Sequence, residues 1–129
     1  MKKIEPFGYL MTLDCYGCKK GICDDLAFCY SFLEDLVVEL GVSRQSPPFI
    51  FKSDEIKYPD KAGLSGWIPL IESGIQIHTL TQKNFISIDI YSCRYISSEH
   101  IEAYVRNSLC CIEIETNYVE RGIKYNDIQ

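Results

Sequence analysis

The segment "WIPLIESGIQIHTLTQKNFISIDIYS" (residues 67–92) decides the fold. It contains two apolar runs, 67–80 and 85–92, on either side of the polar residues 81–84. The second run alternates strictly, with isoleucine at every second position. A strand with one buried face has this period of two. The sequence therefore predicts a β-hairpin whose strands are 67–80 and 85–92.

Pairing Leu80 with Phe85 predicts the register of this hairpin. Ser73 then faces a serine of the second strand, and Glu72 faces Cys93. Directly opposed residues have Cβ atoms about 5 Å apart. We therefore expect a carboxylate, a hydroxyl and a thiol in one neighbourhood.

A simpler interpretation is open at this point, and periodicity alone favours it. Ser73 and Gly74 can mark only a β-bulge, since glycine inside a strand often does so. His78 is then a half-buried histidine and Cys93 a core residue.

Outside the hairpin, the chain shows two helical and three strand-like segments. Helices are expected at 24–40 and 99–109, strands at 7–16, 47–52 and 110–119, and a polar loop at 53–66. In the first helix, Leu26, Cys29, Leu33, Leu36 and Leu40 recur at helical spacing. In the second, Ser98 is the expected cap, and Ile101, Tyr104, Val105 and Leu109 the buried stripe. This order predicts an α+β two-layer sandwich, with an antiparallel sheet and both helices on one face.

Composition limits the class of protein. The chain of 129 residues is 47% hydrophobic and 24% charged, which fits one globular domain, 1–129. Its net charge of -5 argues against nucleic acid or an anionic membrane as the main partner. No stretch reaches the roughly 20 apolar residues that cross a bilayer. The N-terminal "MKKIEPFGYL" lacks the apolar core of a signal peptide, so a cytoplasmic protein is expected.

The seven cysteines are many for this length. Cys15 and Cys18 form a C-x-x-C pair, followed by Cys23 and Cys29. A zinc site needs a second well-spaced pair of Cys or His ligands, which the sequence does not offer. We therefore expect no metal, and interpret most of these cysteines as small core residues.

The polar residues of the hairpin resemble the core motif of the small prokaryotic S-adenosylmethionine decarboxylases. That family typically reads G-V-S-G, E-S-H, I-H-T-W-P-E and T-C-G. This chain reads "GLSG" (63–66), "ESG" (72–74), "IHTLTQ" (77–82) and "SCR" (92–94). The likeness extends to "FGYLMTLDCYGC" (7–18) and "VERGIKYNDI" (119–128), and so covers most of the chain.

The resemblance implies that the chain makes its own cofactor. Family members cleave themselves before a serine, which becomes an N-terminal pyruvoyl group. The matching bond here is Glu72–Ser73, which would give a β chain (1–72) and an α chain (73–129). The pyruvoyl ketone serves as an electron sink for decarboxylation of a bound amine, as pyridoxal phosphate does. The resemblance also implies a homodimer whose sheets face each other and share their active sites.

Four residues match the family's catalytic positions, and the resemblance implies their roles. The hydroxyl of Ser73 attacks the carbonyl of Glu72, and Ser65 donates to the developing oxyanion. His78 then removes the α-proton of Ser73. In turnover, Cys93 is the proton donor to the carbanion, a step that suits a thiol with an ordinary pKa near 8.5.

The match fails where the family contacts its substrate. The histidine of E-S-H is Gly74, and the tryptophan of W-P-E is Leu80. Gln82 replaces the glutamate that is expected to bind the ribose hydroxyls, so it brings no charge. Gln82 and Glu72 remain the expected substrate contacts. Candidates for stacking on the adenine ring are Phe7, Phe49 and Tyr58.

The resemblance as a whole implies S-adenosylmethionine as the substrate. Its decarboxylated product would supply aminopropyl groups for spermidine synthesis. Two alternatives remain open. The first is a pyruvoyl-dependent decarboxylase of arginine or ornithine, with Glu55 or Asp60 as the acidic group. The second is a non-cleaving relative that acts as a binding partner of an active paralogue.

Overall fold

One antiparallel sheet of six strands, in the order β2-β3-β4-β5-β1-β6, forms the frame of the protein. The computed structural model describes residues 5–128; the first residues of the segment tested for a signal peptide, 1–4, lie outside them. The strands are β1 (Gly8–Tyr16), β2 (Phe49–Lys52), β3 (Leu64–Leu70), β4 (Ser73–Leu80), β5 (Phe85–Ser92) and β6 (Glu113–Arg121). The helices are α1 (Leu26–Leu40) and α2 (Ser98–Leu109), with short 3-10 turns η1 (Ile22–Asp24), η2 (Pro59–Lys61), η3 (Thr81–Lys83) and η4 (Tyr125–Asp127).

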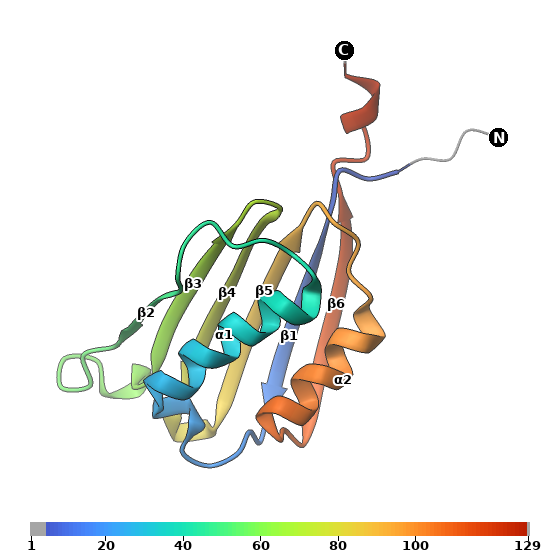
Figure 1. Cartoon of the computed structure of the whole chain (residues 1–129). Helices are drawn as coiled ribbons and strands as arrows, with labels where there is room; N and C mark the ends of the chain where they lie inside the picture. The colour runs from blue at the N-terminus through green and yellow to red at the C-terminus, as the bar shows by residue number, and fades with distance from the viewer. Residues whose placement is uncertain (1–4, 129) are drawn as a thin grey trace.

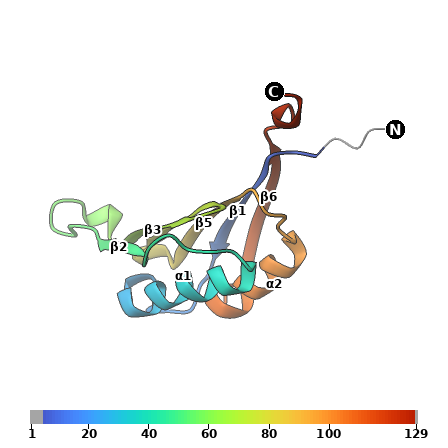
Figure 2. The same cartoon turned by 45° about the horizontal axis from the view of Figure 1, so that its top comes forward.

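Both helices cover the same face of the sheet, as Figures 1 and 2 show. The predicted α+β two-layer sandwich is therefore confirmed. The alternating side chains of the central strands explain this arrangement. Those that point toward the helices are almost fully buried, among them Met11, Leu13, Ile68, Ile75, Ile77, Ile86, Ile88 and Ile90. Each such side chain contributes about 1.5–3 kcal/mol by leaving water, which fixes which face the helices cover.

The structure confirms the predicted register of β4 and β5. Leu80 pairs with Phe85 and Ser73 with Ser92. The prediction of a single strand over 67–80 is wrong, because the chain reverses at Ile71–Glu72 and the segment forms the end of β3 and all of β4. The polar segment 53–66 likewise ends earlier than expected, since β3 begins at Leu64.

The helices form close to the predicted bounds. Asp25 caps α1, its carboxylate accepting the N–H of Phe28 at 3.0 Å. Leu26 was expected in the buried stripe, but it is 44% exposed because it stands at the first helical position, beyond the edge of the core. The cap of α2 is Ser97 rather than Ser98.

Five of the seven cysteines are core residues, as predicted. Cys15, Cys18, Cys23, Cys29 and Cys111 are buried, and all seven cysteines are free thiols. Burial raises the pKa of Cys18 and of Cys29 to about 12, and that of Cys23 to about 11. Such thiols stay protonated and unreactive at neutral pH. Within residues 5–128, no group of three or more His, Cys, Asp or Glu side chains is placed to hold a metal ion.

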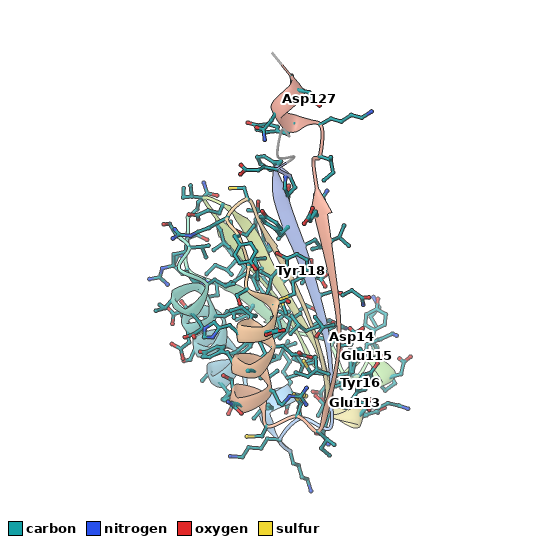
Figure 3. All side chains as sticks on the ribbon, turned by 90° about the vertical axis from the view of Figure 1, so that its right-hand side faces the viewer. Asp14, Tyr16, Glu113, Glu115, Tyr118 and Asp127 are labelled. Atoms are coloured by element: carbon teal, nitrogen blue, oxygen red, sulfur yellow. The ribbon has the colours of Figure 1, made fainter. Side chains whose placement is uncertain are left out.

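The second face of the sheet carries polar and aromatic side chains, and neither helix of residues 5–128 covers it (Figure 2). At the β1–β6 end, the hydroxyl of Tyr16 donates to the carboxylate of Glu115 on the neighbouring strand (Figure 3). We call this surface the open face. In the described part of the chain, neither helix is long and apolar enough to cross a membrane.

Candidate active site

The turn between β3 and β4 has an unusual backbone. Its two residues are Ile71 and Glu72, and the first residue of β4, Ser73, has a φ of 149°. Two-residue hairpin loops normally place glycine or asparagine at positive φ inside the loop. Here neither loop residue has positive φ, and the distortion falls on a serine. A side chain at such a φ costs on the order of 1–3 kcal/mol, and the surrounding structure must hold it there.

Hydrogen bonds fix this turn on both sides. On one side, Ser43 accepts the N–H of Ile71 at 2.8 Å and donates its own N–H to the carboxylate of Glu72 at 2.9 Å. On the other side, the N–H of Cys93 donates to the backbone carbonyl of Glu72 at 2.8 Å. The carbonyl of the Glu72–Ser73 bond is therefore polarised by a fixed donor. A donor in this position stabilises negative charge that develops on the carbonyl oxygen.

Ser65 and His78 form a second cluster on the open face. They are paired across β3 and β4, and the hydroxyl of Ser65 lies 3.0 Å from Nδ1 of His78. His78 is five residues from Ser73 along β4, which corresponds to roughly 17 Å at the rise of an antiparallel strand. Within one chain, the imidazole is therefore far from the Glu72–Ser73 bond.

The first glycine of "GLSG" sets the position of Ser65. Gly63 has a φ of +153°, and a Cβ atom there would lie 1.9 Å from the carbonyl oxygen of Thr79. The buried hydroxyl of Thr79 completes this close approach, since it accepts the N–H of Leu64 at 2.9 Å and donates to the carbonyl of Cys23 at 2.6 Å. The start of β3 is thus locked onto β4 beside His78.

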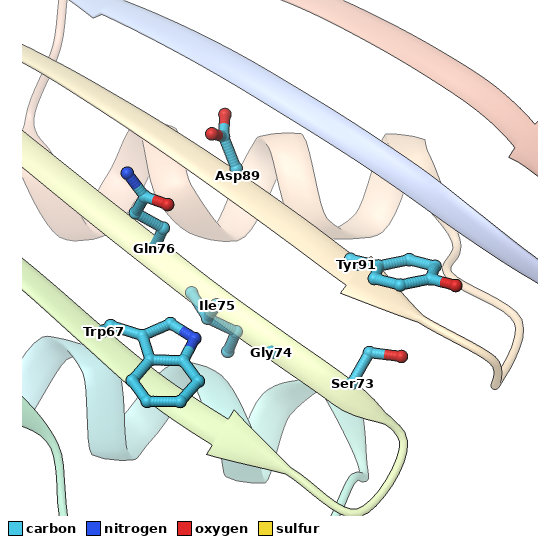
Figure 4. Close-up of a pocket in the computed structure, with 7 residues that line it drawn as sticks. All are labelled: Trp67, Ser73, Gly74, Ile75, Gln76, Asp89 and Tyr91. Carbon is cyan, nitrogen blue, oxygen red and sulfur yellow. The ribbon is translucent and has the colours of Figure 1, made fainter.

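A hollow of about 340 Å³ lies on the open face directly beside Ser73 (Figure 4). It is lined by Trp67, Ser73, Gly74, Ile75, Gln76, Asp89 and Tyr91. Trp67 and Gln76 also line a second hollow of about 320 Å³, which contains Ser65 and His78. Asp89 reaches solvent, but partial desolvation and then the nearby charge of Asp14 raise its pKa.

The structure therefore divides the residues predicted from sequence into two groups. Glu72, Ser73 and Cys93 meet at one end of the hairpin, and Ser65 and His78 meet along the strand. Gln82 joins neither group, because it lies in η3 and its amide donates to the carbonyl of Pro59 at 3.2 Å.

The sequence did not identify Trp67 and Asp89, which line the hollow, as site residues. Trp67 falls within the first of the two predicted apolar runs, and Asp89 within the alternating second run. Both lie on the open face, and the alternation of β5 was a signal that could have placed Asp89 there. Alternation could not place Trp67 in the same way, because the prediction of one strand over 67–80 overlooked the reversal at Ile71.

The model of the S-adenosylmethionine decarboxylase family matches residues 9–122 of the chain. The chain belongs to this family. Since the family consists of decarboxylases, the protein is classed with the carboxy-lyases. The S-adenosylmethionine decarboxylase proenzyme of Clostridium botulinum (strain Langeland) is 28% identical over 116 residues, which cover 89% of this chain and 94% of that protein. The proenzyme of Geobacillus sp. (strain WCH70) is 23% identical over 121 residues, covering 94% and 92%.

A solved member of the S-adenosylmethionine decarboxylase family has the same fold. The crystal structure of the adenosylmethionine decarboxylase from Aquifex aeolicus superposes with a TM-score of 0.78 at 23% identity. The match covers 92% of this chain and 93% of that one. The two-layer architecture is thus shared despite the low identity.

Proposed function

We propose that the protein cleaves itself between Glu72 and Ser73 and then decarboxylates S-adenosylmethionine with the pyruvoyl group formed from Ser73. The observation that carries this proposal is the geometry of the turn. Ser73 has a strained backbone, and the carbonyl that precedes it accepts a hydrogen bond from Cys93 at 2.8 Å. A strained residue beside a polarised carbonyl favours attack of its hydroxyl on that carbonyl.

The cleavage is an acyl shift followed by an elimination. The hydroxyl oxygen of Ser73 bonds to the carbonyl carbon of Glu72 while the C–N bond breaks and the hydroxyl proton passes to the nitrogen, so that the peptide becomes an ester with a free amine. A base removes the α-proton of Ser73, the bond between its Cβ and the ester oxygen breaks, and the main-chain carboxylate of Glu72 leaves as the new C-terminus. Addition of one water to the resulting dehydroalanine releases ammonia and leaves the ketone.

The residues around Ser73 fit this group and its chemistry. The pyruvoyl group supplies a carbonyl that accepts the electrons released when carbon dioxide leaves. Cys93 adjoins the same turn and is exposed, so its thiol is available to donate a proton. The carboxylate of Glu72 already binds the N–H of Ser43, which favours a role in holding the turn over a substrate contact.

We also propose that the active enzyme is a homodimer. The distance between Ser73 and the Ser65–His78 pair supports this, because a base roughly 17 Å away within the chain cannot reach the α-proton. A second subunit that packs on the open face in the antiparallel sense would bring its own Ser65–His78 pair to Ser73. Isologous dimers of this kind are the commonest oligomers.

A second candidate function is decarboxylation of a basic amino acid, and Asp89 favours it. Its carboxylate lies in the hollow beside Ser73, where it could bind a guanidinium or ammonium group. Glu55 and Asp60, which the sequence suggested for binding a basic amino acid, fit this role less well than Asp89. Glu55 lies 3.5 Å from the ammonium of Lys52, and Asp60 is exposed on η2.

The intact mass of the purified protein tests the proposal. We expect two pieces, 1–72 and 73–129, the second lighter by one ammonia than a simple hydrolysis product. Ser73→Ala should stay whole, whereas Ser98→Ala, on the helical layer, should cleave like the wild type. A single full-length mass after long incubation would contradict the enzyme function and leave the non-cleaving relative. Carbon dioxide release from S-adenosylmethionine, arginine and ornithine then separates the two candidate substrate classes.

A further inference from the structure

Trp67 lines both hollows of the open face. It is the only tryptophan in the chain and is 49% exposed. Its indole stacks on Phe49 of β2, with ring centroids 6.0 Å apart and an interplanar angle of 20°. Phe49 is itself 48% exposed in the single chain, so the pair forms an aromatic wall on the open face. Wide aromatic surfaces of this kind are costly to leave in water and commonly mark a binding site.

The indole lies close to the space that a side chain at residue 74 would enter. A Cβ atom on Gly74 would lie 3.0 Å from Nε1 of Trp67. Gly74 does not have the left-handed φ that favours glycine. A Cβ atom at residue 74 would instead crowd the indole, which would have to move by a few tenths of an ångström, so residues 74 and 67 are coupled through space. Figure 4 shows the indole beside Gly74 on the wall of the hollow that Ser73 also lines.

The place of Trp67 relative to Ser73 indicates what it contacts. Trp67 pairs with Gln76, three residues along β4 from Ser73, or roughly 10 Å. A substrate whose amine reacts at residue 73 must extend from there along the hollow. In S-adenosylmethionine, the group at the end opposite to the amine is the adenine ring. Aromatic side chains hold bases by stacking on their faces.

We propose that Trp67 stacks on the adenine ring of the substrate, and that Gly74 is glycine in this chain to leave room for the indole. The proposal rests on the proposed function and assigns a specificity residue to it. Of the aromatic residues considered from sequence, Phe49 belongs to this wall as the support of Trp67. Phe7 instead packs on Tyr125, with centroids 4.7 Å apart.

Fluorescence of the single tryptophan tests this contact directly. The full-length Ser73→Ala protein, which does not turn over, is titrated with S-adenosylmethionine, with 5′-methylthioadenosine and with arginine. Quenching by both adenine compounds, with dissociation constants of the same order, is expected, and none by arginine. Absence of quenching by the adenine compounds overturns the proposal. Quenching by arginine alone also overturns it, and favours the basic amino acid as substrate.

Substitutions give a second readout. In the cleaved enzyme, Trp67→Ala should raise KM roughly tenfold and raise KM more than it lowers kcat. Trp67→Phe should have a smaller effect, and Val38→Ala, an exposed apolar side chain on α1, should have none. Equal KM values for Trp67→Ala and the wild type overturn the proposal.

A double-mutant cycle tests the pairing with Gly74. Gly74→Ala should shift the emission of Trp67 and weaken binding of 5′-methylthioadenosine several-fold in the uncleaved protein. The same substitution should weaken binding less in the Trp67→Phe background, and calorimetry measures all four variants of the cycle because that background has no tryptophan. Additive effects in the cycle contradict the pairing.

The two proposals fail in different ways. If the wild-type chain stays whole, its mass rules out the proposed function, while the fluorescence titration still reports whether adenosine compounds bind at Trp67. If the chain cleaves and decarboxylates S-adenosylmethionine without any change in tryptophan emission, only the role of Trp67 is lost.

Discussion

At the scale of single residues, local strain and chemistry coincide at Ser73. Its φ of 149° is one that non-glycine residues avoid, and it is maintained by the hydrogen bonds of Ser43 and Cys93 on either side of the turn. Breaking the Glu72–Ser73 bond would release this strain. The strain energy stored in the backbone of Ser73 therefore favours cleavage of this bond.

Ser73→Gly should separate the strain from the chemistry. Glycine adopts this φ without a steric penalty, so the variant should be more stable than Ser73→Ala by about 1 kcal/mol. Both variants lack the hydroxyl and should remain uncleaved. Thermal or urea unfolding of the two full-length proteins measures the difference. If Ser73→Ala proves the more stable, Ser73 is not strained in the folded chain.

Cys93→Ala should leave self-cleavage unchanged but reduce the rate of decarboxylation. The donor to the Glu72 carbonyl is a backbone N–H, which alanine retains, so cleavage should proceed. Decarboxylation should fall by about 100-fold or more, because the proton donor is gone. Mass and carbon dioxide release are measured on the same preparation. Normal turnover would remove Cys93 from the proton-transfer step.

At the scale of elements, the hairpins show what the sequence could and could not predict. Strict alternation in β5 fixed its register against β4, because a slip of one residue would expose every isoleucine. The reversal at Ile71–Glu72 was missed because neither residue is typical of turns. The unusual φ lies one residue later, on Ser73, and it is enforced by Ser43 and Cys93, which are distant in sequence.

The candidate site, like the hairpins, could be predicted only in part. The predicted register of β4 and β5 placed Glu72, Ser73 and Cys93 together, because Ser73 begins β4, Glu72 directly precedes it and Cys93 directly follows β5. The position of Trp67 in the hollow could not be predicted, because it requires the β3–β4 reversal.

Thr79→Val should destabilise the junction of β3 with β4. The substitution keeps the shape of the side chain but leaves the N–H of Leu64 and the carbonyl of Cys23 without their partner. Each such buried group costs about 1–3 kcal/mol. We expect the free energy of unfolding to fall by about 2 kcal/mol or more in urea denaturation. Thr116→Val, whose hydroxyl donates to Glu102 near the surface, is the control and should change it far less.

At the scale of the whole molecule, the buried thiols give stability a definite pH dependence. Their pKa values are raised by burial, so the folded state keeps protons that the unfolded chain loses. Stability should therefore be fully present below about pH 8.5 and fall as the pH rises above it. Melting temperatures measured from pH 7 to 10 check this, and Cys18→Ala should reduce the slope. A flat profile would mean that these thiols are not buried in solution.

The proposed dimer predicts complementation between inactive chains. Ser73→Ala and His78→Ala should each be inactive alone. Co-expressed, they form mixed dimers in which one of the two sites has both residues intact, so random pairing should restore roughly a quarter of wild-type activity. Ser73→Ala co-expressed with Cys93→Ala should stay far below this level, because Ser73 and Cys93 belong to the same end of one chain. No recovery in the first mixture would place His78 and Ser73 in one subunit.

The strand order has a consequence for a nicked chain. The piece 1–72 contributes β2, β3 and β1, and the piece 73–129 contributes β4, β5 and β6. In the sheet, β1 is inserted between β5 and β6, so the two polypeptides interlock and neither carries a contiguous half of the sheet. They cannot dissociate along a single strand pair, because separation breaks the β3–β4, β5–β1 and β1–β6 pairings together. After cleavage, the two pieces should unfold in a single cooperative transition and co-elute in native chromatography. A denaturing gel of the same sample should show two bands.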